Sequence, residues 1–352
     1  TTPDQGGICK RRDASKSSAA SPVELARTLE LPTPGAAVAV SWSPDSRFLV
    51  AASDYGNVLS IWDRSGKRVN QLHRLGGGPT LWGSISFLQG SSQVAFPPPD
   101  AAPHSTAFSI WDVRTGNPVR QVDGPQPDYR AQHFMTSPDQ LLLAVATRGG
   151  GRRKNYNANL VIYNTVTWAP TSSVDISEGI SSLSVFSRGT QVVVGTTING
   201  MIHILDMRTG ASIGSILAYE PSPLGILAIS AVAGSPDGDK ILLGLGQTLL
   251  SQGERSESWS RSLATTQIIR VPDGVRVWSS SEPKAPIRAA AWDPKNRFAA
   301  LLDNADTLYL IRSDGNTSKI QVPPRALSAA IAPDASYIAI TNDHGVRVYR
   351  IK

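Results

Sequence analysis

The sequence predicts an all-β fold in which one four-stranded antiparallel unit is repeated seven times, and three observations lead to this prediction. A short turn, in most copies built on Pro and Asp, recurs with centres near residues 44, 88, 138, 188, 236, 294 and 333. Each turn is followed by short apolar segments of strand length. No segment has the spacing of apolar residues that indicates a long amphipathic helix. A regular repeat of this length indicates units that pack against one another as an array.

Length and composition indicate a large globular chain. It has 352 residues, of which 40% are hydrophobic and 18% are charged, against roughly 25% charged in average globular domains. This excludes a disordered chain, and no apolar run approaches the roughly 18 residues that a membrane helix needs. The one cysteine, Cys9, excludes an internal disulfide framework and a cysteine-ligated metal centre.

The net charge of +6 comes from two segments. Residues 1–22, predicted to be a flexible basic tail or linker, hold four basic and two acidic residues. One loop adds four basic residues, and the rest of the chain is balanced; the four are Arg148, Arg152, Arg153 and Lys154. A basic field over the whole body, typical of a dedicated nucleic-acid binder, is therefore missing. Residues 1–22 have no apolar core of signal-peptide length, so cytoplasm is the default expectation for localisation.

The first two strands of each unit flank the Pro-Asp turn. In the first unit the turn is Ser43-Pro44-Asp45, with Trp42 before it and a short apolar strand after it. The pattern returns at residues 137–139, 235–237, 292–294 and 332–334, and in weaker form at residues 87–90 and 186–189.

The third strand of each unit ends in an apolar residue, and a polar residue usually follows. The endings are Ile61-Trp62-Asp63, Ile110-Trp111-Asp112, Ile162-Tyr163-Asn164, Ile204-Leu205-Asp206, Ile269-Arg270, Ile311-Arg312 and Tyr349-Arg350. A glycine-bearing turn usually comes next, and a fourth strand such as residues 68–72 or 118–122 follows. Strands joined by tight turns in this order form a four-stranded antiparallel meander.

These repeats resemble the WD40-repeat β-propeller family over residues 24–352. The resemblance rests on Trp62-Asp63 and Trp111-Asp112, with decayed equivalents at Tyr163-Asn164 and Leu205-Asp206. It implies a seven-bladed WD40-like β-propeller. The family's Gly-His pair near each repeat start is absent and the last three blades lack Trp-Asp, so we do not expect the hydrogen-bonded His–Asp network of many family members.

The two ends of the chain complete each other in this prediction. The seventh repeat stops one strand short, and residues 23–31 (VELARTLEL) form a spare strand before the first repeat. We expect residues 23–31 to supply the outer strand of the last blade, which closes the ring and covers two open sheet edges. Residues 23–352 are then one propeller domain, and with its edges closed we expect it to be monomeric.

Three connections between the second and third strands are much longer than the others. They span residues 97–105 in blade two, 148–157 in blade three and 247–266 in blade five. The resemblance places these connections and the inter-blade loops on one face of the disc. Because binding residues concentrate on loops held by a rigid scaffold, we predict that this face binds a partner.

The predicted binding residues come from the blade-three and blade-five loops and the inter-blade loop before blade three. They are Arg148, Arg152, Arg153, Lys154, Tyr156, Tyr129, Arg130, Arg255, Trp259 and Arg261. Arginine forks suit carboxylate or phosphate partners, and exposed aromatic residues are enriched at interface hot spots. The alternative is a solvated basic loop with aromatic rings folded onto their own loops. Four other tryptophans follow the strand pattern and are predicted to be core: Trp42, Trp62, Trp111 and Trp292.

Sequence signals for catalysis are weak. Gly149-Gly150-Gly151 is not followed by the Lys-Ser/Thr of a nucleotide-binding loop, no two histidines have metal-ligand spacing, and no nucleophile elbow occurs. We therefore predict a non-catalytic scaffold, without cofactor or metal, that binds an acidic protein or peptide. Two alternatives stay open: a lactonase-like propeller hydrolase, which needs acidic or histidine side chains facing a channel metal, and nucleic-acid binding through the blade-three loop, with steep salt dependence.

Overall fold

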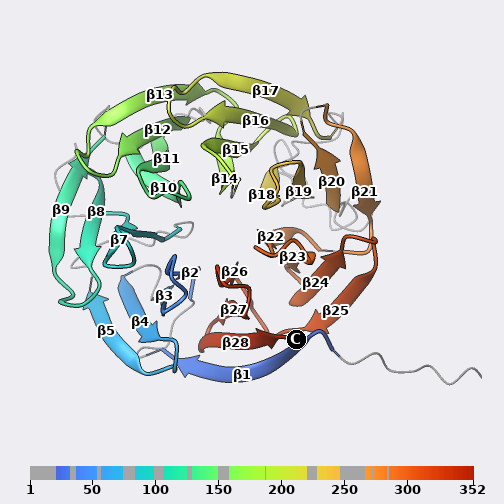
Figure 1. Cartoon of the computed structure of the whole chain (residues 1–352), viewed down its shortest axis with the longest axis horizontal. Coiled ribbons are helices and arrows are strands. Elements are labelled where there is room, and N and C mark those ends of the chain that lie inside the picture. Colours follow the sequence, from blue (N-terminus) through green and yellow to red (C-terminus); the bar gives the residue numbers. More distant parts are fainter. Residues whose placement is uncertain are drawn as a thin grey trace, which may run out of the picture.

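The chain folds into seven four-stranded antiparallel sheets arranged around a central opening (Figure 1). This computed structural model describes residues 21–31, 37–53, 57–73, 84–98, 106–124, 129–149, 158–186, 188–219, 228–245, 266–271, 273–283 and 285–352, with the backbone alone at residues 106, 129, 130, 148 and 149. Every regular element in these ranges is a β-strand, and none of them contains a helix that could span a membrane. The predicted all-β, seven-bladed propeller is confirmed.

Each blade runs from an inner strand at the central opening to an outer strand at the rim. Blade one contains β2 (Ala39–Trp42), β3 (Phe48–Ser53), β4 (Val58–Asp63) and β5 (Arg68–His73). Blade two contains β6 (Ser86–Leu88), β7 (Gln93–Phe96), β8 (Thr106–Asp112) and β9 (Pro118–Asp123). Blade three contains β10 (Tyr129–Thr136), β11 (Leu142–Gly149), β12 (Ala158–Asn164) and β13 (Pro170–Ile176).

The next three blades repeat this order. Blade four contains β14 (Ile180–Val185), β15 (Gln191–Thr196), β16 (Met201–Asp206) and β17 (Ser212–Leu217). Blade five contains β18 (Ile229–Gly234), β19 (Lys240–Leu245), β20 (Thr266–Arg270) and β21 (Arg276–Ser280). Blade six contains β22 (Ile287–Trp292), β23 (Phe298–Asp303), β24 (Thr307–Arg312) and β25 (Thr317–Gln321).

Blade seven combines strands from both ends of the chain. Its first three strands are β26 (Ala329–Ile331), β27 (Tyr337–Asn342) and β28 (Gly345–Ile351), and its outer strand is β1 (Val23–Glu30). β1 pairs antiparallel with β28, and Figure 1 shows the two strands side by side at the rim.

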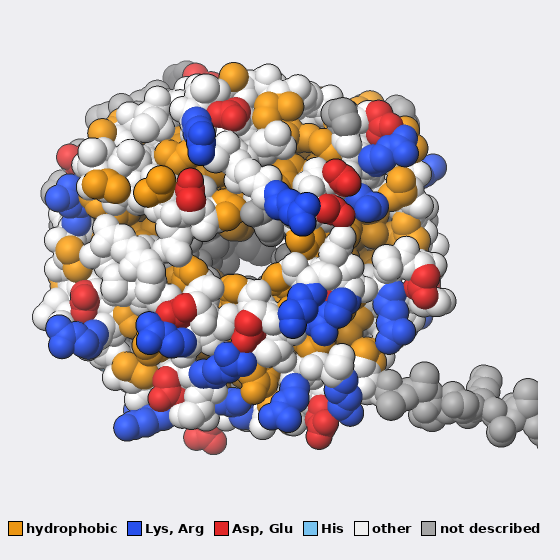
Figure 2. All heavy atoms as spheres, in the orientation of Figure 1, with side chains coloured by type: hydrophobic (Ala, Val, Ile, Leu, Met, Phe, Trp, Pro, Cys, Tyr) orange, Lys and Arg blue, Asp and Glu red, His pale blue; other side chains and the backbone are white. Residues whose placement is uncertain are grey.

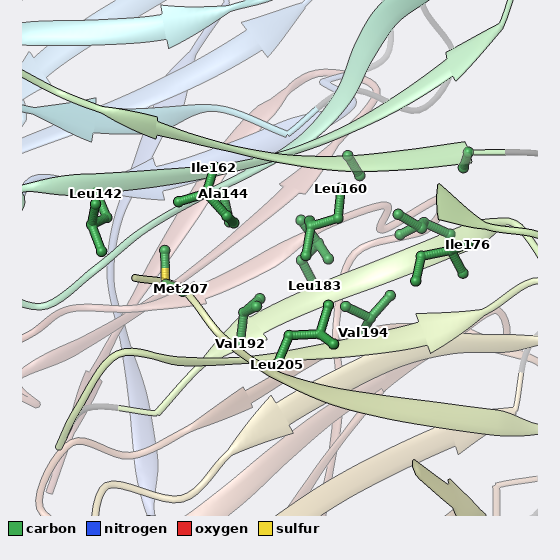
Figure 3. Close-up of a cluster of buried hydrophobic side chains, with 13 residues drawn as sticks. Leu142, Ala144, Leu160, Ile162, Ile176, Leu183, Val192, Val194, Leu205 and Met207 are labelled. Atoms are coloured by element: carbon green, nitrogen blue, oxygen red, sulfur yellow. The ribbon is translucent and has the colours of Figure 1, made fainter. Parts of the chain in front are cut away.

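The hydrophobic core is divided among the interfaces between neighbouring blades. Figure 3 shows one of these clusters, in which side chains of β11 and β12 from blade three face those of β14, β15 and β16 from blade four. The middle strands are covered on both faces, so β15 has five consecutive buried residues after Gln191. Continuous apolar runs are typical of strands buried on both faces. Outer strands such as β17 face solvent and alternate between exposed and half-buried residues.

The Pro-Asp turns are held by their own polar side chains. In blade one, Ser43 Oγ donates to Asp45 Oδ1 at 2.7 Å and accepts from the Phe48 amide at 2.8 Å. Blade three repeats this arrangement, and hydrogen bonds from the Ser137 hydroxyl and the Leu141 amide hold the pKa of Asp139 below its usual range. Local bonds of this kind explain why the turns are so visible in the sequence.

The aspartates of the Trp-Asp pairs stabilise the next turn. Asp112 Oδ1 accepts from the Arg114 amide at 3.0 Å and the Thr115 amide at 2.6 Å. The neighbouring Trp111 Nε1 is buried and has no hydrogen-bond partner in the described part of the chain.

Three of the four tryptophans predicted to be core are buried, and the fourth is not. Trp42, Trp62 and Trp111 are 8%, 2% and 8% exposed. The prediction for Trp292 is wrong, because its side chain is only half-buried and lines a cavity between blades five and six. The cause lies in the neighbouring blade, which presents Lys240 where the equivalent neighbour of Trp42 presents an aromatic ring.

Candidate binding face

The antiparallel meander sorts all connections onto two faces of the disc. Connections between first and second strands and between third and fourth strands lie on one face, which we call the turn face; each is four or five residues long. Connections between second and third strands and between blades lie on the other, which we call the loop face. Figure 2 shows the turn face, where acidic and basic side chains alternate around the opening.

Tight connections on the loop face are closed by a polar side chain at the end of the second strand. Asp303 is buried, and its Oδ1 accepts from the amides of Ala305 and Thr307 at 3.0 and 2.9 Å. Asn342 does the same for blade seven, and the Thr196 hydroxyl bonds to two carbonyls in blade four. These side chains satisfy the backbone of connections only two to four residues long.

Two of the three blades with insertions lack this device. At the equivalent position, blade two has Pro98 and blade five has the buried Leu245, neither of which can hydrogen-bond through its side chain. Blade three keeps part of it, because Thr147 Oγ1 donates across the strands to the carbonyl of Asn159 at 3.2 Å, as Thr196 does to Met201. The connections in these blades are 9, 8 and 20 residues long between strand ends. The insertion in blade five therefore covers residues 246–265, slightly different from the predicted 247–266.

Blade three carries its loop on a longer stem than the other blades. β10 and β11 have eight residues each, whereas the second strands of blades one, four, five, six and seven have six. The pairing continues to the end, with Arg148 opposite Ala158 and Arg130 opposite Arg148. The strands that flank residues 150–157 are therefore paired up to Arg148 and Ala158.

The structure locates three of the predicted binding residues by their backbone. Tyr129 and Arg130, predicted to lie in an inter-blade loop, instead form the first two residues of β10, and Arg148, predicted to lie in the insertion, belongs to β11. Register places Arg130 directly opposite Arg148. The remaining seven lie outside the described residues: Arg152, Arg153, Lys154, Tyr156, Arg255, Trp259 and Arg261.

Arg288 of blade six is surrounded by three aspartates from blades six and seven, which the sequence analysis did not predict. Arg288 is half-buried, and its Nη1 donates to the carbonyl of Ala326 at 3.0 Å. Burial lowers the pKa of Arg288, and attraction to Asp306, Asp303 and Asp343 opposes that shift. In sequence these aspartates look like ordinary turn residues, so only the fold brings them together.

The inner strands supply mostly small, uncharged side chains to the central opening. The seven inner strands contain no Asp or Glu and one histidine, His133 in β10. Burial lowers the pKa of His133 to about 4, so it is neutral at physiological pH. A channel-metal hydrolase needs several carboxylates or histidines at these positions, and within the described ranges no group of three or more potential ligands gathers anywhere.

Comparison with known proteins identifies one segment of the chain. Residues 25–63 match the family model described as WD domain, G-beta repeat. The matched segment begins in β1, the outer strand of blade seven, and ends with Asp63, the last residue of β4 in blade one. The sequence repeat is thus offset by one strand from the structural blade. No curated protein matches the chain significantly.

Proposed function

The chain is a WD40-repeat β-propeller, and from this premise we propose that it is a non-catalytic scaffold that binds an acidic protein or peptide through its loop face. Propellers of this family are commonly platforms for protein interactions. The loop face, with the blade-two, blade-three and blade-five insertions, is the surface on which we expect the partner to bind.

One observation carries this proposal: connection lengths differ by more than one residue only on the loop face. Every turn-face connection has four or five residues, whereas loop-face connections between second and third strands range from 2 to 20. Random drift in length would affect both faces. Elaboration of one face on a uniform scaffold is typical of a binding surface.

The scaffold is well suited to hold such loops. Ser181 Oγ in blade four donates to the Ile229 carbonyl in blade five at 2.5 Å, and Ser230 Oγ donates in the same way to Ile287 in blade six. These bonds link the inner strands of blades four, five and six. A stiff scaffold reduces the ordering cost of binding.

Charge supports an acidic partner. The blade-three loop holds Arg152, Arg153 and Lys154, close in sequence to Arg148, while the body outside it and the tail is balanced. Such a cluster increases the association rate with an acidic surface and orients it.

A paired pull-down tests the proposal. One bait is the native chain, and the other carries Arg152→Glu, Arg153→Glu and Lys154→Glu. A control bait carries the same change in charge on the turn face, at the exposed residues Lys67, Arg114 and Arg188. We expect a protein partner that the native and control baits recover and the loop variant loses.

Other outcomes separate the alternatives. Equal recovery by all three baits contradicts the blade-three site. Recovery of nucleic acid, with affinity falling by orders of magnitude between low and physiological salt, supports the nucleic-acid alternative. Turnover of lactone substrates that requires added metal would replace the scaffold proposal with the hydrolase one.

A further inference from the structure

Two interfaces between blades have equivalent geometry on the turn face but different contents. Between blades seven and one, Trp42 stacks on Tyr337 with ring centroids 6.1 Å apart. The guanidinium groups of Arg27 and Arg64 lie over the Tyr337 ring at 5.3 and 5.5 Å. Arg64 also pairs with Asp334 at 2.7 Å. We call this the filled cleft, since both rings are at most 9% exposed.

The equivalent interface between blades five and six is hollow. Trp292 ends its inner strand as Trp42 does, but Lys240 replaces Tyr337, and the short Ser313 replaces Arg64. Trp278 of β21 pairs with Ile268 of β20, and in this outer strand it takes the position that Arg27 occupies in β1. A cavity of about 280 Å³ remains, and its lining includes Trp278, Trp292 and Lys240. We call this the open cleft.

The walls of the open cleft are fixed by contacts with both blades. Trp292 Nε1 donates to Asn296 Oδ1 at 2.7 Å, and Asn296 Nδ2 donates to Asp237 Oδ2 of blade five at 2.8 Å. On the other wall, Gly315 lies against Trp278, so that a Cβ added at Gly315 would be 3.4 Å from the indole. The cavity is therefore preformed rather than dependent on rearrangement.

The charged groups that line the open cleft are Lys240, Arg312 and Asp314, and the acidic groups at the cleft already accept hydrogen bonds. Asp314 is engaged at both oxygens by Asn316, and Asp237 accepts from its own turn and from Asn296. Burial alone would raise the pKa of Asp237, but these hydrogen bonds and Lys240 lower it overall.

The two basic groups are less engaged. Lys240 Nζ is 4.0 Å from the Asp237 carboxylate, and the Arg312 guanidinium attracts Asp314 without a side-chain hydrogen bond to any described residue. Both line the cavity. A ligand with negative charge close to an apolar group complements this arrangement.

The cavity is small: its volume of about 280 Å³ is at the lower edge of the roughly 300–1,000 Å³ spanned by pockets for whole small molecules. The apolar lining includes Ile268, Phe298 and Ile311 besides the two tryptophans. One large apolar side chain of a protein, inserted as an anchor, fits these walls and this volume.

We propose that the open cleft is a second binding site, which takes an aromatic side chain of a partner protein flanked by aspartate or glutamate. The ring packs between Trp278 and Trp292, and the flanking carboxylates pair with Lys240 and Arg312. The site is on the turn face, so it does not depend on the loop-face site proposed above.

Fluorine NMR of the full chain labelled with 5-fluorotryptophan tests the site directly. The chain has eight tryptophans, and Trp278→Phe and Trp292→Phe assign the two signals concerned. The probe is acetyl-Asp-Phe-Asp-amide. We expect it to shift both signals saturably, and the matched acetyl-Asp-Ala-Asp-amide to bind about 10- to 100-fold more weakly because no ring is buried. Acetyl-Asn-Phe-Asn-amide should bind roughly two- to fivefold more weakly, as exposed ion pairs contribute little.

A graft from the filled cleft supplies the decisive variant. Lys240→Tyr with Ser313→Arg recreates the contents of the filled cleft, and we expect it to abolish the saturable shift. Trp42→Phe assigns the Trp42 signal, whose unchanged position in the grafted variant shows that this variant is folded; Ser313→Arg alone provides a milder version. The loop variant at residues 152–154 should bind the probe normally, which separates this site from the loop-face proposal.

Two outcomes would overturn the inference. The first is that millimolar probe leaves the Trp278 and Trp292 signals unmoved. The second is that the grafted variant binds the probe as well as the native chain does, because the ring would then be bound elsewhere.

Discussion

The filled and open clefts show how one backbone arrangement can serve stability in one place and binding in another. Trp42 and Trp292 both end an inner strand immediately before a Pro-containing turn. Trp42 stacks on Tyr337 and donates from Nε1 to the Ala330 carbonyl at 3.2 Å, whereas Trp292 faces Lys240 across a cavity and donates to its own turn. The neighbouring blade contributes Lys240 and Trp278 to this difference, and the tryptophan's own blade contributes Ser313 in place of Arg64.

The largest expected effect contrasts the two tryptophans. Trp42→Ala should lower the free energy of unfolding by about 3–5 kcal/mol, the usual cost of removing a large buried aromatic side chain. Trp292→Ala should cost only about 1–2 kcal/mol, because its side chain already borders a cavity. Urea unfolding followed by circular dichroism measures both; equal losses would contradict the distinction between the clefts.

Tyr337 of the filled cleft and Lys240 of the open cleft are equivalent positions, and exchanging their residue types should change the free energy of unfolding in opposite directions. Tyr337→Lys removes the ring under Arg27 and Arg64 and places a third cation there, so we expect a loss of roughly 2–3 kcal/mol. Lys240→Tyr gives Trp292 an aromatic neighbour and should raise stability by about 0.5–1.5 kcal/mol. Melting temperatures of the two variants provide the measurement, and a loss in both would show that the clefts are not interchangeable.

A smaller, pH-dependent effect belongs to the ion pair of the filled cleft. Burial alone would raise the pKa of Asp334, but hydrogen bonds from Ser336 and the Arg64 guanidinium lower it overall. A carboxyl with a lower pKa in the folded state stabilises the fold above its unfolded pKa of about 4, and this contribution is lost as pH falls through the folded value.

Asp334→Asn should therefore destabilise the chain at pH 7 and leave it nearly unchanged at pH 2. We expect about 1 kcal/mol or less at neutral pH, since both partners are partly exposed. Unfolding curves across this range test the sign, and a loss that persists at pH 2 would indicate that packing rather than charge is involved.

The smallest expected effect concerns the loop face. Replacing Arg152, Arg153 and Lys154 by glutamate should change the free energy of unfolding by less than about 0.5 kcal/mol, as is usual for surface substitutions away from caps and buried pairs. Differential scanning calorimetry beside the pull-down checks this. A large loss of stability would mean that the loop packs on the propeller and that any loss of binding is indirect.

The fold could be predicted because its signals are local. A Pro-Asp turn, as in residues 43–45, bonds to itself and leaves the same pattern in each repeat. The lengths of the connections could also be taken from the sequence, and the three long ones identified the loop face as the elaborated face. Contacts between repeats leave no such pattern: nothing near Trp292 in the sequence shows that Lys240 and Trp278 will be its neighbours.

The candidate site was predicted less completely for the same reason. Arg130 and Arg148 are 18 residues apart in sequence yet directly opposed in the strand pairing. The three aspartates around Arg288 come from two hairpins: Asp303 and Asp306 from β23–β24 in blade six, and Asp343 from β27–β28 in blade seven. Residue type and spacing identify which loops are elaborate, whereas the partners of each side chain follow from the order of blades around the ring.

Because blade seven combines the first and the last strand of the propeller, it cannot be completed until the last strand has been synthesised. β1 leaves the ribosome before every other strand of the propeller, but its partner β28 is made about 315 residues later. At roughly 5–20 residues per second, β1 waits on the order of 15–60 s with an unpaired edge. During that interval it is open to pairing with other nascent chains. Blades one to six can form while synthesis continues, so closure of the ring joins the first strand of the propeller to the last one made.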